Sequence, residues 1–182
     1  KTQLSVLQCP SDNSSRELSN VQWQWEIIFV AVKNYKGAIG DTRIGGATSI
    51  HQGTEPDCHN TIGCSGLFYR NDYQEPVTFK KITDGLSQTL MLGEDLPRHN
   101  YHSAAFYANA DYASCSAPLN FKPEPPIPNQ WWNVISFRSD HPGGAHFANA
   151  DASVRFVSDS IDYKLYRAMS TRNGGEVVGA AE

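Results

Sequence analysis

The clearest pattern of apolar and polar positions lies in the last third of the chain. Val154 and Phe156 occupy alternate positions, which is the period of two of a half-buried strand. We therefore predict a β-hairpin over residues 145–157 with its turn at 149–152. The turn contains Asp-Ala, whereas Asp-Gly would be the better pair for a tight hairpin turn.

A helix is predicted to follow this hairpin, from Ile161 to about Thr171. From Ile161 onward, apolar residues fall at i, i+4, i+7 and i+8 and form one stripe. Residues 158–160 (Ser-Asp-Ser) offer N-caps. The Asn-Gly-Gly of residues 173–175 is typical of a helix end.

Shorter apolar runs predict strands elsewhere, separated by segments rich in turn-forming residues. These runs lie within residues 1–8, 25–35, 77–79, 89–93, 104–108 and 133–137. The proline-rich stretch 121–130 must be extended, and residues 37–66 form a long segment without clear periodicity. The patterns predict a β-rich domain with few helices.

The composition agrees with one globular domain over residues 1–182. Apolar residues make up 40% and charged residues 19% of the chain, which excludes a disordered protein. The net charge is -4 and the 15 basic residues form no run, so nucleic acid is not an expected partner. No apolar stretch approaches the roughly 18–20 residues that span a bilayer.

Four cysteines predict disulfides if the compartment is oxidising. Cys58 and Cys64 bracket a short loop that contains glycine, and we predict that they pair, which leaves Cys9 with Cys115. The rival interpretation is a zinc site of Cys58, His59 and Cys64. The disulfide is favoured because zinc sites usually contain closer pairs, such as C-x2-C.

Histidines and carboxylates elsewhere are candidates for a metal site of two imidazoles and one carboxylate. The candidate ligands are His99, His102, His141 and Asp151, with His146, Glu94, Asp95 and Asp140 nearby in the sequence. The signal is weak, because such histidine spacings occur by chance and no HExxH motif supplies a base. For His141 and Asp151 we favour a structural role, in which the histidine holds a turn and the aspartate shapes the hairpin tip.

Motifs for other chemistry are missing. The sequence has no G-x-S-x-G, no GxxxxGK[ST] and no GxGxxG, and no cofactor is expected. Calcium is the one further ion considered, because several aspartates lie in loops, but none of them shows the D-x-[DN]-x-[DN]-G pattern. These aspartates are Asp41, Asp57, Asp72 and Asp111.

Two pairs of tryptophans are candidates for ligand contact. Trp131 and Trp132 follow the proline-rich stretch, and Trp23 and Trp25 are two positions apart. Rings on the same face at a loop edge can stack on sugars, or they can pack in a core or an interface. We favour packing for both pairs.

Several stretches together resemble the bacterial prepilin-type family that carries the H-X9-DG domain, whose function is uncharacterised. The matching stretches are residues 139–157 (the signature), 9–12 (a C-P-S-D turn), 82–90 with Gly93-Glu94, and Ile161-Asp162 with 168–176 (the closing helix and glycine pair). Within this signature, the motif residues are His141, Pro142, Gly143, Gly144 and Asp151. Ala152 stands where the family has glycine, which puts the usual geometry of the hairpin tip in question.

The resemblance implies an α+β fold, with a pilin-like antiparallel sheet as the head and a C-terminal helix after a hairpin. Family members usually begin with a prepilin leader and a long apolar helix, as type IV pilins and type II secretion pseudopilins do. The chain resembles only the globular part after that helix. The resemblance therefore implies export to the periplasm, cell surface or extracellular space, with membrane attachment only through the absent helix.

We expect a non-enzymatic exported protein with a structural, assembly or binding role, whose partners are other pilin-like subunits or copies of itself. The alternative is an extracellular carbohydrate-binding or metal-dependent hydrolytic protein with surface glycans as partners. The tryptophan pairs, the histidines and the long segment 37–66 would suit that alternative. A third interpretation is a structural module stabilised by calcium.

Overall fold

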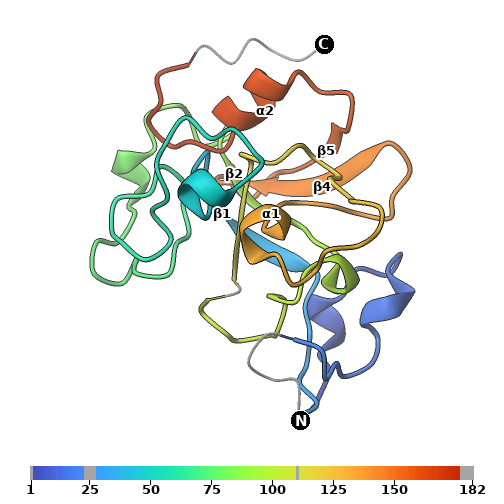
Figure 1. Ribbon diagram of the computed structural model, residues 1–182. Helices are drawn as coiled ribbons and strands as arrows, with labels where there is room; N and C mark the ends of the chain where they lie inside the picture. Colours follow the sequence, from blue (N-terminus) through green and yellow to red (C-terminus); the bar gives the residue numbers. More distant parts are fainter. Residues whose placement is uncertain (1, 23–27, 110, 177–182) are drawn as a thin grey trace.

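The computed structural model describes residues 2–22, 28–109 and 111–176, and these are arranged around one sheet of five strands (Figure 1). The strands are β1 (Tyr35–Gly40), β2 (Leu90–Glu94), β3 (Tyr112–Ser114), β4 (Gly144–Asn149) and β5 (Val154–Ser158), in the spatial order β3-β1-β2-β4-β5. β1 and β3 are parallel, and the other neighbouring pairs are antiparallel. The α+β class agrees with this sheet and its few helices. The expected wholly antiparallel sheet is wrong, because the long connection from β1 through β2 allows β3 to return in parallel.

Helices are few and short. The α-helices are α1 (Trp131–Val134) and α2 (Tyr163–Ala168), and the 3-10 helices are Ser5–Leu7, Asn13–Ser15, Gly46–Thr48, Phe79–Lys81 and Pro97–His99. Tyr166 of α2 is fully buried, and its ring centroid lies 6.2 Å from that of Phe147 in β4. This contact joins α2 to the sheet. Within the described residues, no helix is long and apolar enough to cross a membrane.

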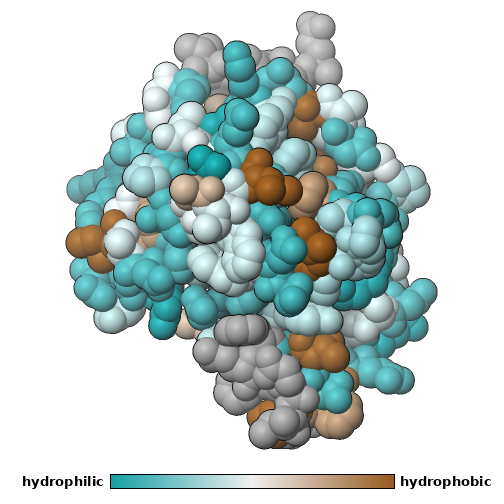
Figure 2. Space-filling view, in the orientation of Figure 1, coloured by the Kyte–Doolittle hydropathy of each residue, from teal (hydrophilic) through white to brown (hydrophobic). Residues whose placement is uncertain are grey.

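The hydrophobic core is formed by residues of the sheet together with α2 and several connecting segments. Tyr166, Phe137, Phe147 and Ile39 are among the largest fully buried side chains and belong to one apolar cluster. In the view of Figure 2, hydrophobic residues form small separate patches among hydrophilic ones. That face is therefore ordinary for a folded domain.

The predicted hairpin is confirmed. β4 and β5 pair in antiparallel register on either side of the expected turn. The carboxylate of Asp151 accepts hydrogen bonds from the backbone N–H and the hydroxyl of Ser153. Ala152 has a φ of 66°, which is the left-handed conformation that favours glycine. The chain thus carries alanine at a position whose backbone geometry suits glycine.

The C-terminal helix exists but is shorter than predicted. Asp162, and not residues 158–160, caps it, because its carboxylate accepts a hydrogen bond from the backbone N–H of Leu165 at 2.9 Å. At the other end, the N–H groups of Ser170 and Thr171 bond to carbonyls three residues back. This tighter pattern ends the α-helix before the predicted boundary.

Several predicted strands are wrong. Among the described residues, none of four runs forms a strand of the sheet. The runs 1–8 and 77–79 contain parts of 3-10 helices, the run 104–108 contains one isolated bridge at Ala104, and the run 133–137 begins inside α1. The run 25–35 contributes two isolated bridges before β1 begins at Tyr35, and residues 25–27 lie outside the described part. The run 89–93 is correct and becomes β2. Short apolar runs mark contact with the core but do not distinguish strands from other buried segments.

The apolar pattern misses β1 because its sequence, YKGAIG, contains two glycines and a lysine. The glycines allow another segment to pack closely on this strand. A Cβ on Gly37 would come within 2.5 Å of the Phe68 side chain, and a Cβ on Gly66 would come within 2.2 Å of the Ile39 backbone. The Gly66 N–H donates to the Ile39 carbonyl at 2.9 Å. Glycine in this strand therefore marks the place where a loop packs directly on it.

A buried ion cluster lies where β1 and β2 meet. Asp95, directly after β2, lies 3.1 Å from the ammonium of Lys36 and 3.1 Å from the guanidinium of Arg138, and all three side chains are fully buried. Both cations also donate hydrogen bonds to backbone carbonyls. The cluster thereby connects β1, the end of β2 and the segment after α1.

Replacing Asp95 by Asn should strongly destabilise the fold. The change leaves Lys36 and Arg138 buried without a counter-charge, which typically costs about 3–5 kcal/mol. Glu75→Gln is the matched control, because the ion pair of Glu75 with Lys81 is largely exposed and such pairs contribute about 0–1 kcal/mol. Urea unfolding measures both free energies, and equal losses would contradict the role assigned to Asp95.

Ala152→Gly should stabilise the protein. A residue with a side chain costs about 1–2 kcal/mol in the left-handed conformation, and the greater freedom of glycine in the unfolded chain offsets about 0.5–1 kcal/mol of the gain. We expect a net gain of about 0.5–1 kcal/mol in the free energy of unfolding. Ala145→Gly, at a buried strand position, is the control and should destabilise. A loss of stability in Ala152→Gly would contradict the cost assigned to alanine at this position.

Candidate functional site

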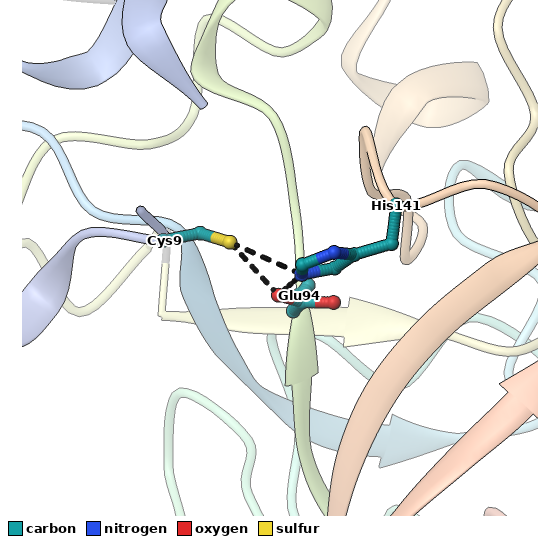
Figure 3. A group of neighbouring side chains, drawn as sticks. All are labelled: Cys9, Glu94 and His141. Carbon is teal, nitrogen blue, oxygen red and sulfur yellow. Dashed lines mark hydrogen bonds and ion pairs between the residues drawn. The ribbon is translucent and has the colours of Figure 1, made fainter. Parts of the chain in front are cut away.

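Three side chains that are far apart in the sequence meet at one end of the sheet (Figure 3). The Sγ of Cys9 lies 3.1 Å from Oε1 of Glu94 and 3.5 Å from Nε2 of His141. The same Nε2 lies 3.3 Å from Oε1 of Glu94. Within the described ranges, no other three cysteine, histidine or acidic side chains bring their ligand atoms this close together. We refer to this group as the Cys9–Glu94–His141 cluster.

The C-P-S-D turn holds Cys9 in place. The N–H of Cys9 donates to Oδ1 of Asn34 at 3.0 Å, and the N–H of Asp12 donates to the Cys9 carbonyl at 3.0 Å. Asn34, just before β1, also donates its side-chain amide to the Asp12 carboxylate at 2.8 Å. Cys9 is 4% exposed. This burial raises the pKa of its thiol, and the Glu94 carboxylate acts in the same direction.

Glu94 is the last residue of β2 and is 3% exposed. Adjacent residues of an extended chain face opposite sides, so Asp95 enters the ion cluster while Glu94 reaches Cys9. The Oε2 of Glu94 accepts a hydrogen bond from the backbone N–H of His146 at 2.8 Å. That bond fixes the carboxylate and leaves Oε1 directed at Cys9 and His141.

His141 forms the rim of the cluster. Its backbone N–H donates to the hydroxyl of Ser139 at 3.2 Å, and its side chain is 29% exposed. The imidazole packs edge-on against that of His146, with ring centroids 4.7 Å apart. The ring is therefore the most exposed member of the cluster.

The remaining signature residues shape the turn that carries His141. Pro142 and Gly143 form this turn, and Gly143 has a φ of 79°. Gly144 begins β4, where a Cβ would come within 2.1 Å of the Val157 carbonyl oxygen. Asp151 lies at the other end of β4, at the hairpin tip. The Asp151 carboxylate bonds within the hairpin tip, whereas the His141 ring contacts Cys9 and Glu94.

The cluster opens on a surface cavity of about 390 Å³, whose lining includes Tyr35, Leu92, His146, Phe147 and Val154. A nucleophilic cysteine needs a lowered pKa, whereas the pKa of Cys9 is raised. The thiol and the Glu94 carboxylate also approach the same nitrogen of His141, so this carboxylate does not orient the ring through the opposite nitrogen, as in a catalytic triad. The three groups instead direct their donor atoms at one point.

The other predicted metal ligands do not join the cluster. Asp151 lies at the hairpin tip, where its carboxylate accepts a hydrogen bond from the backbone N–H of Ser153. His99 and His102 are buried elsewhere, and burial lowers the pKa of both imidazoles, to about 4 for His102. Of the four weak candidate ligands, His141 alone belongs to the cluster.

The cysteines form one disulfide and two free thiols. Cys58 and Cys64 form the predicted disulfide, with Cα atoms 5.6 Å apart, and the rival zinc site is wrong because these sulfurs are bonded to each other. The predicted pairing of Cys9 with Cys115 is also wrong, since both are free. Cys9 lies in the cluster. Cys115 is fully buried in the core, where burial raises its pKa to about 12.

Trp131 and Trp132 pack against each other. Their rings are perpendicular, at 87°, with centroids 5.8 Å apart, and Trp131 also contacts the ring of His59. Perpendicular rings do not present one common face to a sugar. Trp23 and Trp25 lie outside the described residues.

Two of the aspartates considered for calcium are engaged by other groups of the chain. Both carboxylate oxygens of Asp41 accept hydrogen bonds from Arg167 at 2.8 Å. Asp57 accepts hydrogen bonds from the backbone N–H of Gly45 and from His59. Groups of the protein therefore already satisfy these two carboxylates, which stabilise their loops through these hydrogen bonds.

The described part of the chain is thus a β-rich domain with a mixed sheet and, in the Cys9–Glu94–His141 cluster, a largely buried set of mixed donor atoms. A family model described as "Protein of unknown function (DUF1559)" matches residues 1–164. The chain therefore belongs to this family. No curated protein matches the chain, and no solved structure matches it.

His102→Gln should reduce the loss of stability in mild acid. The ordinary histidine pKa is 6.5, whereas in the folded protein burial and the Lys36 charge lower that of His102 to about 4. Between these pH values the unfolded chain binds more protons, so stability falls as the pH drops, by up to about 3 kcal/mol. We expect urea unfolding at about pH 7 and about pH 4.5 to differ less for the variant than for the parent.

Some pH dependence should remain in this variant, because burial also lowers the pKa of His51 and His99. A difference between the two pH values as large as that of the parent protein would show that His102 does not contribute. Both proteins are measured in the same buffers. The comparison therefore removes the contribution of carboxylates that titrate in the same range.

Proposed function

We propose that this chain is an exported, non-enzymatic protein with a structural or assembly role, the head of a pseudopilin-like subunit. The resemblance of residues 139–157 to the prepilin-type signature supports this class. The Cys58–Cys64 disulfide supports export, because disulfides persist in the periplasm and at cell surfaces and are rare in the cytosol.

The observation that carries the assembly role is an apolar cavity with exposed aromatic walls. The cavity has a volume of about 590 Å³, and Leu67, Phe68, Tyr73, Val77, Phe79 and Met91 are among its lining residues. Tyr73 is 73% and Phe79 is 72% exposed. Of its described lining residues, Asp72 alone is charged. Apolar surface gathered in one place is typical of a contact with another protein.

The proposed partner is another subunit of the same kind. A large apolar side chain that moves from solvent into an interface contributes about 1.5–3 kcal/mol. Subunits that are already held side by side meet at a high effective concentration. Two exposed rings are then enough to fix one subunit against the next.

The alternative, an extracellular carbohydrate-binding or metal-dependent hydrolytic protein, has less support. Trp131 and Trp132 are perpendicular and pack on each other. The free thiol that lies near a histidine has a raised pKa, which does not favour nucleophilic chemistry. Neither observation supplies a flat platform for a sugar or an activated thiol nucleophile.

Phe79→Ser in the full-length protein should weaken assembly without unfolding the domain. The ring is 72% exposed, so its loss removes a contact between subunits and little core packing. We expect the variant to be exported with its disulfide formed but to lose most of its share in the assembled surface fraction of its own cells. Phe106→Ser is the matched control, because Phe106 is 78% exposed and does not line the cavity.

Cell fractionation and a non-reducing peptide map separate the two parts of the proposal. A parent protein that stays in the cytoplasm with Cys58 and Cys64 reduced would show that export is wrong. A Phe79→Ser variant that assembles as fully as Phe106→Ser would show that the apolar cavity is not the contact surface.

A further inference from the structure

We propose that the Cys9–Glu94–His141 cluster is a binding site for a divalent transition-metal ion, zinc above all. The ligand atoms are Sγ of Cys9, Oε1 of Glu94 and Nε2 of His141. This site is separate from the apolar cavity of the proposed assembly role, and it stands or falls independently of that role.

The separations of the three atoms match the edges of a zinc coordination tetrahedron. Zinc binds sulfur at about 2.3 Å and nitrogen or oxygen at about 2.0–2.2 Å, so tetrahedral ligand atoms lie about 3.3–3.6 Å apart. The observed separations are 3.1, 3.3 and 3.5 Å. Only the sulfur and the carboxylate oxygen have to move slightly apart, and each side chain keeps its present direction.

The chemistry of the donors selects the metal. Thiolate and imidazole favour zinc and related ions, whereas calcium and magnesium favour sites made of oxygen atoms alone. A thiolate and a carboxylate together balance the charge of a divalent ion, which matters because Cys9 and Glu94 are 4% and 3% exposed. Binding releases the thiol proton to solvent, and the metal–sulfur bond replaces the S–H···O hydrogen bond to Glu94.

Outer groups already hold the ligands in position. The backbone N–H of His146 donates a hydrogen bond to Oε2 of Glu94, which leaves Oε1 for the ion. The hydroxyl of Ser11 lies 2.9 Å from Sγ of Cys9, where it can donate to a thiolate. Such partners orient metal ligands and tune their affinity. The cluster therefore has both a ligand set and its supporting bonds.

The fourth coordination position faces the cavity beside the cluster. His141 is the exposed member of the three, and the cavity lining includes the cluster itself. We assign this position to water. With three protein ligands from three distant segments, the ion acts as a clamp that joins the N-terminal turn, the end of β2 and the turn before β4.

The test uses purified protein stripped with a chelator and titrated with cobalt(II) and then with zinc(II). We expect a single equivalent of cobalt to give the visible bands of a tetrahedral site and a thiolate-to-cobalt charge-transfer band in the near ultraviolet. Zinc should displace the cobalt and raise the melting temperature. Cys9→Ser should abolish the charge-transfer band.

His141→Gln should lower the zinc affinity. Loss of an outer partner of a metal ligand costs roughly 10–100-fold in affinity, and loss of a direct ligand should cost at least as much. Because His141 lies at the rim, this variant keeps the test decisive if Cys9→Ser does not fold. Cys115→Ala and His59→Ala are the matched controls. Cys115 is the other free cysteine, and His59 is paired with a carboxylate outside the cluster.

Both control variants should keep the charge-transfer band and the parent affinity. Three outcomes would overturn the proposal. The first is the absence of tetrahedral cobalt bands at one equivalent, and the second is a charge-transfer band that survives Cys9→Ser or is lost in Cys115→Ala. The third is a zinc affinity that is the same in His141→Gln and His59→Ala.

Discussion

The arrangement of this domain depends on the buried carboxylate of Asp95. It is the counter-charge that Lys36 and Arg138 share, and without it both cations would lie unpaired in the core. Such clusters contribute little net stability compared with apolar packing, but breaking one is costly. We therefore interpret this cluster as fixing which segments lie together. Because Glu94 is the preceding residue, the backbone position that sends Asp95 into the core also places Glu94 beside Cys9.

The elements that could be predicted from the sequence are those whose signals are local. The hairpin at 145–157 combines alternation with a turn, and the Cys58–Cys64 disulfide closes a short loop. β1 depends instead on partners far along the chain, since its glycines receive a distant loop and its lysine meets Asp95. Neither property appears in an apolar pattern.

The candidate site was only partly predictable for the same reason. Cys9, Glu94 and His141 each lie in a stretch that resembles part of the family pattern, but pairing by elimination places Cys9 in a disulfide with Cys115. Cys9 is separated by 85 residues from Glu94 and by 132 from His141. No spacing rule connects residues so far apart, because the order of the strands brings them together. The cluster is recognisable only from the structure, where Cys9 is free and lies beside a carboxylate that the backbone N–H of His146 already holds.

These long separations along the sequence also affect how the chain folds. Closing loops of this length costs entropy before any contact forms. Cys9 reaches Glu94 only when the N-terminal turn meets the end of β2, and His141 contacts both only when β4 has joined the sheet. The contact between the imidazole and the thiol therefore cannot form before β4 is in place. The complete cluster is a property of the finished domain alone.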